Sequence, residues 1–111
     1  MKVVVQGHHV DVSEALREYT EEKVNRFTKF FQNISKVDIF FEGEKNGEYR
    51  AKVVVGLPKH KTVVCAEKGK TLYAALDLAA DAAERSLNAF KEKLRRRDDR
   101  ERVTRRLTRE S

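Results

Sequence analysis

The chain has 111 residues, of which 40% are hydrophobic and 38% are charged, and it carries a formal net charge of +6. This length suits one domain with a single core, and the composition is that of a soluble protein with a heavily solvated surface. No apolar run approaches the roughly 20 residues of a membrane span, and the N-terminus lacks the apolar h-region, roughly 7 to 15 residues long, of a signal peptide. The single cysteine, Cys65, excludes an internal disulfide and suits a reducing compartment. We therefore expect a cytoplasmic protein with no membrane partner.

Positive charge gathers at the C-terminal end of the chain. Residues 85–111 hold 11 Lys or Arg against 5 Asp or Glu, whereas the residues before them hold 13 of each sign. A basic segment on an otherwise neutral domain is typical of contact with a polyanion such as nucleic acid. An ordinary solvated helix face is the alternative, but the neutrality of the rest of the chain favours the polyanion.

The first predicted element is a β-branched strand at residues 2–7, which Gly7 ends. After a loop, Ser13 is a suitable N-cap, and acidic residues follow in the first turns of a helix. Apolar residues then recur at helical spacing, which predicts a helix of about five turns. They are Leu16, Tyr19, Val24, Phe27, Phe30, Phe31 and Ile34.

Three further strands are predicted at residues 36–44, 49–56 and 61–67. Asn46 and Gly47 lie between the first two of these strands. Because both residues tolerate a positive φ, they predict a hairpin with a type I′ turn. A basic turn separates the last two strands.

A second helix is predicted to begin after Thr71, a plausible N-cap. Apolar residues at spacings of three and four predict that it is amphipathic and covers residues 72–97, about 26 residues or roughly 39 Å. They are Leu72, Leu76, Ala79, Ala83, Leu87, Phe90 and Leu94. Residues 98–111 offer only Val103 and Leu107 as large apolar residues, which is too few for a core, so we predict a flexible basic tail or linker there.

The order of the predicted elements is β-α-β-β-β-α. This order predicts an α+β sandwich, with one four-stranded, mainly antiparallel sheet and both helices packed on one of its faces. We assign residues 1–97 to one functional domain and residues 98–111 to the basic tail.

The candidate binding residues lie on the two predicted helices. The second half of the second helix carries Arg85, Lys91, Lys93, Arg95, Arg96 and Arg97. Interaction with the helix dipole accounts for two or three of these cations, but not for the whole run. Lys and Arg neutralise phosphates without reading base sequence, so the segment fits folded RNA. A smaller cluster on the first helix holds Lys23, Arg26 and Lys29, and the two clusters would form one basic groove if the helices pack side by side.

Other chemistry has little support in the sequence. The soft metal-ligand candidates are His8, His9, His60 and Cys65. Their spacing matches no zinc signature, so we interpret the histidines as loop or strand-end residues and the cysteine as a small core residue. No catalytic triad, P-loop or dinucleotide fingerprint occurs, and we predict no enzyme activity, cofactor, metal or small-molecule substrate. Phe40 breaks the alternation of its strand, which suggests that it caps a sheet edge or a helix seam.

Several motifs occur together in this chain. They include VSEALREY at residues 12–19 and LYAALD at residues 72–77, with Gly7, Lys23, Arg26, Phe30, Phe31, Arg85, Leu87, Lys91, Lys93, Leu94 and Arg95. The set resembles the bacterial ribosome hibernation factors, also called ribosome-associated inhibitors or ribosomal subunit interface proteins. LYAALD is similar to the family's acidic-Met-Tyr-Ala-Ala-Ile-Asp segment, and the likeness covers nearly the whole chain up to about Arg97.

This resemblance implies an architecture similar to double-stranded RNA-binding domains and a site on the small ribosomal subunit, in the channel for mRNA and the A- and P-site tRNAs. It implies a translation inhibitor that blocks this channel in stressed or stationary-phase cells and preserves idle ribosomes. The residues implied in rRNA binding are Lys23, Arg26, Arg85, Lys91, Lys93 and Arg95, with Arg96 and Arg97 in compensation for Ala89 and Phe90, where relatives often have basic residues. Family members also gather ribosomes into inactive dimers or keep them as inactive monomers, depending on the segment C-terminal to the domain.

Two alternatives to this interpretation remain open. A general double-stranded RNA-binding module would bind an arbitrary RNA duplex as tightly as it binds ribosomes. An enzyme or metal protein that uses His8, His9 and Cys65 would reveal its metal in an analysis of the purified protein.

Overall fold

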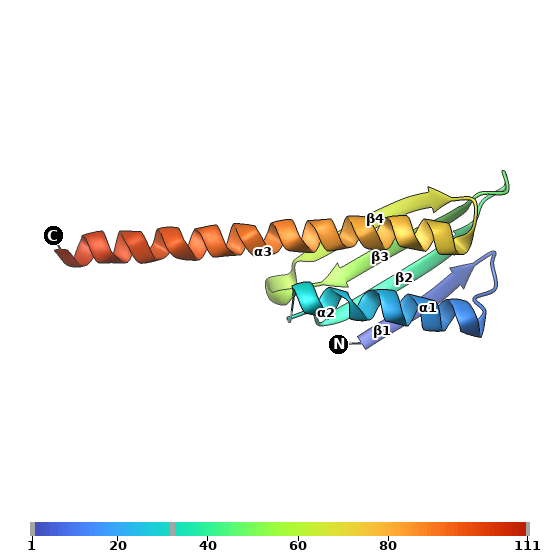
Figure 1. Cartoon of the computed structure of the whole chain (residues 1–111), viewed down its shortest axis with the longest axis horizontal. Coiled ribbons are helices and arrows are strands. Elements are labelled where there is room, and N and C mark those ends of the chain that lie inside the picture. The colour runs from blue at the N-terminus through green and yellow to red at the C-terminus, as the bar shows by residue number, and fades with distance from the viewer. Residues whose placement is uncertain (1, 32, 111) are drawn as a thin grey trace.

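The computed structural model describes the backbone of residues 2–31 and 33–110, and the side chains of these residues apart from Phe30 and residues 97–110. One β-sheet is covered on a single face by three helices (Figure 1). The helices are α1 (Glu14–Asn25), α2 (Phe27–Phe30) and α3 (Leu72–Glu110). The predicted α+β sandwich is confirmed.

The sheet has four strands in the order β1-β2-β3-β4. They are β1 (Lys2–His8), β2 (Lys36–Gly43), β3 (Tyr49–Gly56) and β4 (Thr62–Gly69). β1 pairs with β2 in parallel, with Val5 opposite Ile39, because α1 and α2 carry the chain back to the starting end of the sheet. The other two pairs are antiparallel hairpins. The sheet is therefore mainly antiparallel, as its sequence predicts.

Alternate strand residues form the core beneath the helices. The fully buried strand positions are Val37, Ile39, Phe41, Ala51, Val53 and Val55. The helices add Leu16, Val24 and Phe27 from one side and Ala75, Leu76, Ala79, Ala80, Ala83 and Leu87 from the other. The alanines of α3 leave little side-chain bulk between helix and sheet, and the approach at Gly69 is so close that a Cβ there would lie 2.6 Å from the Ala75 nitrogen. Cys65 packs against this core, as predicted.

The first helical region is shorter than its apolar spacing predicts. Ser13 caps α1 by accepting a hydrogen bond from the Leu16 amide at 3.1 Å, but α1 ends at Asn25 and the short α2 ends at Phe30. Phe31 is extended, with φ −147°, and both Phe31 and Ile34 are buried from outside the helix. The prediction of a five-turn helix was wrong because Phe31 and Ile34 reach the core from the loop after α2. The spacing of apolar residues does not distinguish such a loop from a continued helix.

The β2–β3 hairpin forms where it is predicted, but its turn is of another kind. Among the described residues of this loop, only Gly47 has a positive φ, at 74°, so the turn is not type I′. The Glu44 amide donates to the Glu48 carbonyl at 3.0 Å, which closes a three-residue loop with its left-handed residue last. This is a common hairpin geometry, in which glycine alone must adopt the left-handed conformation.

α3 is longer than predicted. Thr71 caps it by accepting a hydrogen bond from the Ala74 amide at 3.0 Å, and the helical backbone then continues without a break to Glu110. The sequence between them contains no glycine or proline, and residues of high helix propensity dominate it. The helix therefore extends through residues 98–110, and it gives the molecule its 65 Å length.

Candidate nucleic-acid interface

The exposed basic side chains of α3 follow its last buried residue. Leu87 is fully buried and Phe90 packs against the core, whereas all of residues 91–96 are exposed. This segment projects beyond the end of the sheet (Figure 1). Its four cations are Lys91, Lys93, Arg95 and Arg96. The helix thus holds them on a fixed backbone while their side chains remain free to contact a partner.

Two other predicted site residues lie where carboxylates face them. The Lys23 ammonium is 3.2 Å from the Asp77 carboxylate, and the Arg26 guanidinium is 3.8 Å from the Glu84 carboxylate. α1 and α3 do lie side by side on the sheet (Figure 1). The seam between them is therefore lined by ion pairs, not by cations alone, because the acidic first half of α3 is the part that meets α1.

Asp77 also accepts a hydrogen bond from the Tyr19 hydroxyl at 2.7 Å. This hydrogen bond is the main cause of a raised pKa at Tyr19, and burial and the Asp77 charge act in the same direction. Burial lowers the pKa of Lys23, but its hydrogen bond to Asp77 and the negative charges nearby outweigh this and raise it overall. The Tyr19 ring also meets Tyr73 edge-on at 5.1 Å. The four side chains join α1 to the start of α3.

The remaining predicted residues are either exposed or described only by their backbone. Arg85 is exposed and lies on the part of α3 that is packed against the body. Lys29 is exposed on α2. Arg97 lies on the helical backbone, but its side chain is outside the described set. The structure therefore separates the exposed cations of α3 from Lys23 and Arg26, each of which is paired with a carboxylate.

The loop between β3 and β4 adds basic residues beside α3, which the charge pattern of the sequence did not assign to the site. Lys61 lies over the Phe90 ring, 5.5 Å from its centre, and Phe90 in turn meets Phe31 at 5.6 Å. Lys59 and His60 at the loop tip are exposed. The basic turn was visible in the sequence, but its position next to the cationic half of α3 depends on the direction in which α3 crosses the sheet.

The tip of this loop is conformationally strained. Lys59 and His60 both have left-handed backbones, with φ of 61° and 60°. Such values are uncommon for residues other than glycine and asparagine and typically cost about 1 kcal/mol or more each. The chain thus places two basic side chains at a turn that would favour Asn-Gly.

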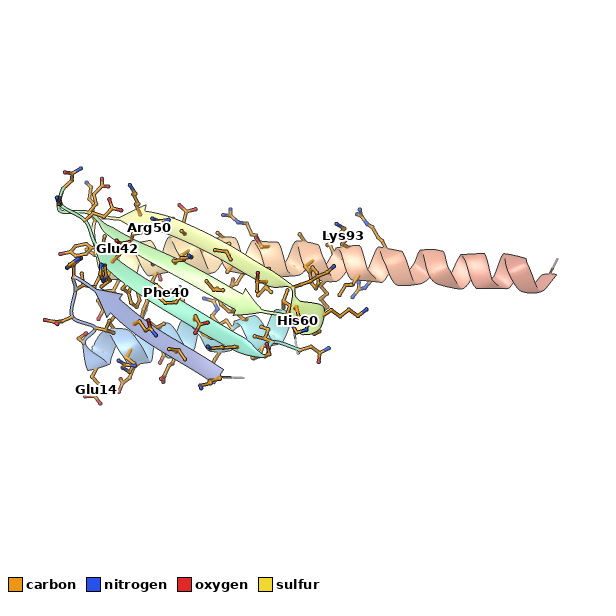
Figure 2. The ribbon with its side chains drawn as sticks, turned by 180° about the vertical axis from the view of Figure 1, so that it is seen from behind. Glu14, Phe40, Glu42, Arg50, His60 and Lys93 are labelled. Atoms are coloured by element: carbon orange, nitrogen blue, oxygen red, sulfur yellow. The ribbon has the colours of Figure 1, made fainter. Side chains whose placement is uncertain are left out.

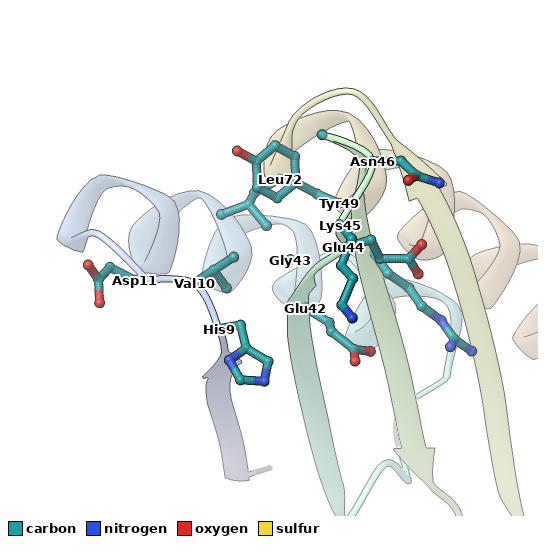
Figure 3. Close-up of a pocket in the computed structure, with 12 residues that line it drawn as sticks. His9, Val10, Asp11, Glu42, Gly43, Glu44, Lys45, Asn46, Tyr49 and Leu72 are labelled. Atoms are coloured by element: carbon teal, nitrogen blue, oxygen red, sulfur yellow. The ribbon is translucent and has the colours of Figure 1, made fainter.

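The opposite end of the sheet has a different character. A hollow of about 1180 Å³ lies between the β1–α1 loop, the β2–β3 loop and the first residue of α3 (Figure 3). Its acidic lining residues are Asp11, Glu42 and Glu44, and its basic ones are Lys45 and Arg50. This mixed lining gives a polyanion no preferred surface.

His8 and His9 also lie near this end, at the end of β1 and in the following loop, as predicted. Their rings are 4.0 Å apart. In the part of the chain whose side chains are described, no group of three or more His, Cys, Asp or Glu residues is arranged to hold a metal ion. Among the described residues, no helix is both long and apolar enough to cross a membrane.

Comparison with known proteins identifies the family. The family model described as Sigma 54 modulation protein / S30EA ribosomal protein matches residues 3–95. The chain is 37% identical over 93 residues to the ribosome hibernation promoting factor of Azotobacter vinelandii, which covers 84% of this chain and 85% of that protein. It is 35% identical over 97 residues to the ribosome hibernation promotion factor of Picosynechococcus sp., which covers 84% of this chain but 50% of that protein. The chain thus spans about half the length of this second relative.

A solved structure has the same fold. The ribosomal subunit interface protein from Coxiella burnetii superposes with a TM-score of 0.77 at 29% identity, over 83% of this chain and 99% of that one. Together with the family model, which matches most of the chain, these likenesses show that the protein belongs to the S30EA family of ribosome-associated hibernation factors.

Proposed function

We propose that this protein is a cytoplasmic, ribosome-binding translation inhibitor. In this proposal it occupies the mRNA and tRNA channel of the small ribosomal subunit and stabilises inactive ribosomes under stress or in stationary phase. The observation that carries the proposal is the exposed cationic segment of α3, on a chain whose family is defined by ribosome-associated proteins. No chemical step is required, because a body lodged in the channel excludes mRNA and tRNA by its volume.

The exposed cations of α3 are the proposed rRNA contacts. Lys91, Lys93, Arg95 and Arg96 extend beyond the body, and Arg85 and Arg97 lie on the same helix. Each phosphate that a Lys or Arg neutralises releases condensed counterions, which stabilises the complex at low salt without a sequence preference. Lys59 and Lys61 extend this surface onto the β3–β4 loop.

Lys23 and Arg26 have a secondary place in the proposal. Each already has a carboxylate partner, so a phosphate that approaches it meets a smaller net positive potential. Arg26 is the more available of the two, because 55% of its side chain is exposed against 20% for Lys23. We expect substitutions here to weaken binding less than substitutions on α3 do.

Cosedimentation with purified small subunits tests the proposal. The variant K91Q/K93Q/R95Q removes three exposed charges from α3, and R17Q/K45Q/K70Q is a matched control that removes three exposed charges elsewhere. The α3 variant is expected to bind at least about tenfold more weakly, whereas the control binds like the unmodified protein. Equal binding by both variants at all salt concentrations would contradict the proposal.

Two further measurements separate the alternatives. Equal affinity for ribosomes and for an arbitrary RNA duplex would favour a general double-stranded RNA-binding module instead. A sucrose-gradient profile of ribosomes with and without the protein distinguishes a factor that forms ribosome dimers from one that keeps inactive monomers.

We also propose that residues 1–97 bind the ribosome and that residues 98–111 act as a basic tail or linker. The buried core lies between Leu16 and Leu87, so removal of the last 14 residues leaves it intact. A chain ending at Arg97 is expected to retain small-subunit binding, with a modest loss from the missing charge. Complete loss of binding by this shortened chain, with its melting temperature unchanged, would contradict this division.

A further inference from the structure

Phe40 lies in the middle of the sheet face that no helix covers. This surface, here called the open face, is formed by alternate residues of the four strands, among them Val4, Gln6, Phe40, Lys52, Val54 and Val64. Figure 2 views the molecule from this side and labels Phe40. Phe40 is 37% exposed, and β1 and β3 flank its strand. It therefore lies at neither a sheet edge nor a helix seam, and the core does not account for it.

The neighbours of Phe40 form a polar row across the strands. Gln6 lies opposite Phe40 on β1, and Lys52 lies opposite it on β3. Arg50 lies two residues before Lys52 on the same side of β3 and is also exposed, with Glu42 directly opposite it on β2. Diagonal neighbours on one sheet face are about 7 to 8 Å apart, within reach of long side chains. An amide, an aromatic ring, two cations and one carboxylate therefore share one small surface.

The open face is also the basic side of the compact body. Its strand positions carry five cations, Lys2, Lys36, Arg50, Lys52 and Lys68, against Asp38 and Glu42. Asp38 is paired with Lys36 at 3.4 Å and Lys68 with Glu44 at 3.3 Å, which leaves Lys2, Arg50 and Lys52 against Glu42. Among the described residues, no ion pair involves Arg50 or Lys52.

The helix side of the body has the opposite charge. Residues 14–29 and 72–84 carry seven acidic side chains against four basic ones. The neutral total of the first 84 residues therefore conceals two faces of opposite sign. A polyanion that approaches the body therefore meets a more positive potential at the open face than along α1 and the first half of α3.

We propose that the open face binds single-stranded RNA, with an unpaired base stacked on Phe40 and the adjacent phosphate on Lys52. An aromatic ring on a basic sheet surface can stack a splayed base, whereas the bases of a duplex are already stacked on one another. Gln6 supplies an amide for the edge of the base. This site is separate from α3 and does not depend on the ribosome assignment.

Fluorescence anisotropy with a labelled oligoadenylate of about ten nucleotides tests this site. The same strand annealed to its complement is the duplex probe. Phe40→Ala is expected to weaken single-strand binding about tenfold and to leave duplex binding unchanged. Phe40→Leu should cause a similar loss, because it retains apolar volume but lacks the ring. Val64→Ala removes bulk from the most exposed apolar residue on the same face and should have no effect.

The α3 cations bind either probe through phosphates, so each Phe40 variant is repeated in the K91Q/K93Q/R95Q background. In that background, Phe40→Ala should still weaken single-strand binding about tenfold, and it should leave the melting temperature unchanged. The proposal is overturned by equal single-strand binding with and without Phe40, by polyglutamate competing as well as RNA, or by self-association of the protein that Phe40→Ala abolishes. Any of these results would leave small-subunit cosedimentation intact, which keeps this test distinct from that of the proposed function.

Discussion

Along α3, the residues as far as Phe90 lie against the sheet and the other helices, whereas residues 91–96 are exposed. The first part is rich in alanine and leucine, and its Asp77 and Glu84 pair with Lys23 and Arg26. The second part is dominated by Lys and Arg. One helix thus stabilises the fold with its first part and presents charge with its second, so substitutions in the two parts should affect different measurements.

The largest expected effect comes from Leu87→Ala, compared with Leu94→Ala. These leucines occupy the same side of α3 two turns apart, but Leu87 is fully buried and Leu94 is 37% exposed. Truncation of a buried leucine leaves a cavity and should lower the free energy of unfolding by about 2 to 5 kcal/mol. Leu94→Ala should lower it by less than about 1 kcal/mol. Urea denaturation measures both, and equal losses would contradict the division at Phe90.

The second prediction concerns the salt dependence of small-subunit binding. If Lys91, Lys93 and Arg95 each neutralise a phosphate, K91Q/K93Q/R95Q should reduce the slope of log K against log salt by about 2 to 3. Its free energy of unfolding should change by less than about 0.5 kcal/mol, because all three side chains are exposed. A reduced affinity with an unchanged slope would mean that these residues do not contact phosphates.

The third prediction tests the strained loop beside the exposed part of α3. Lys59→Asn with His60→Gly supplies the residues that left-handed turn positions favour, and should stabilise the protein by about 1 kcal/mol. The same change should weaken small-subunit binding several-fold, because it removes Lys59. Lys59→Gln removes the charge without easing the backbone, so it should weaken binding without raising the denaturation midpoint. If the double variant is less stable than the unmodified protein, the strain argument is wrong.

The smallest effect is expected at Asp77, in the packed part of α3. Asp77→Asn should cost less than about 1 kcal/mol at neutral pH, because the Asp77 side chain is 40% exposed and Asn can still accept the Tyr19 hydrogen bond. Glu21→Gln, an exposed change on α1, is the control and should cost nothing measurable.

The pH dependence of this cluster depends on the direction of its pKa shifts. The pKa values of Tyr19 and Lys23 are raised above their ordinary 10.0 and 10.5, so both groups bind protons more tightly in the folded protein. Their contribution to stability is complete below about pH 10 and is lost as pH rises through the raised values. Asp77→Asn should therefore flatten the decline in stability above pH 10. An equally steep decline in both proteins would exclude the cluster as its source.

Local chemistry made most of the fold predictable. Ser13 and Thr71 act as N-caps because a hydroxyl can accept from the amide three residues onward in any helix. The alternation in residues 36–44 and 49–56 identified the buried strand face. Phe31 and Ile34 were wrongly assigned to the first helix, because both are buried in the core from the loop that follows α2. The turn at Gly47 was misassigned because loop length, which depends on strand register, selects the turn type.

The candidate site was predictable in its residues but not in its surroundings. The excess of Lys and Arg after residue 84 located the cations of α3. The exposure of Lys91 and Lys93 was not evident from the sequence, because the apolar repeat continues to Leu94, which is itself exposed. The partners of Lys23 and Arg26 depend on which turns of α1 and α3 meet, and no local pattern specifies that. The position of the β3–β4 loop beside Phe90 likewise requires the path of α3 across the sheet.

By itself, the sequence determined the element order, the buried face of each element and the localisation of positive charge on α3, because these depend on periodicity, capping and composition. The tertiary structure decided which charges remain available. It paired Lys23 and Arg26 with carboxylates, placed Lys59 and Lys61 near the exposed end of α3, and left Phe40 on an uncovered basic face. Electrostatic potential and exposure depend on distances between residues remote in the chain, and only packing fixes those distances.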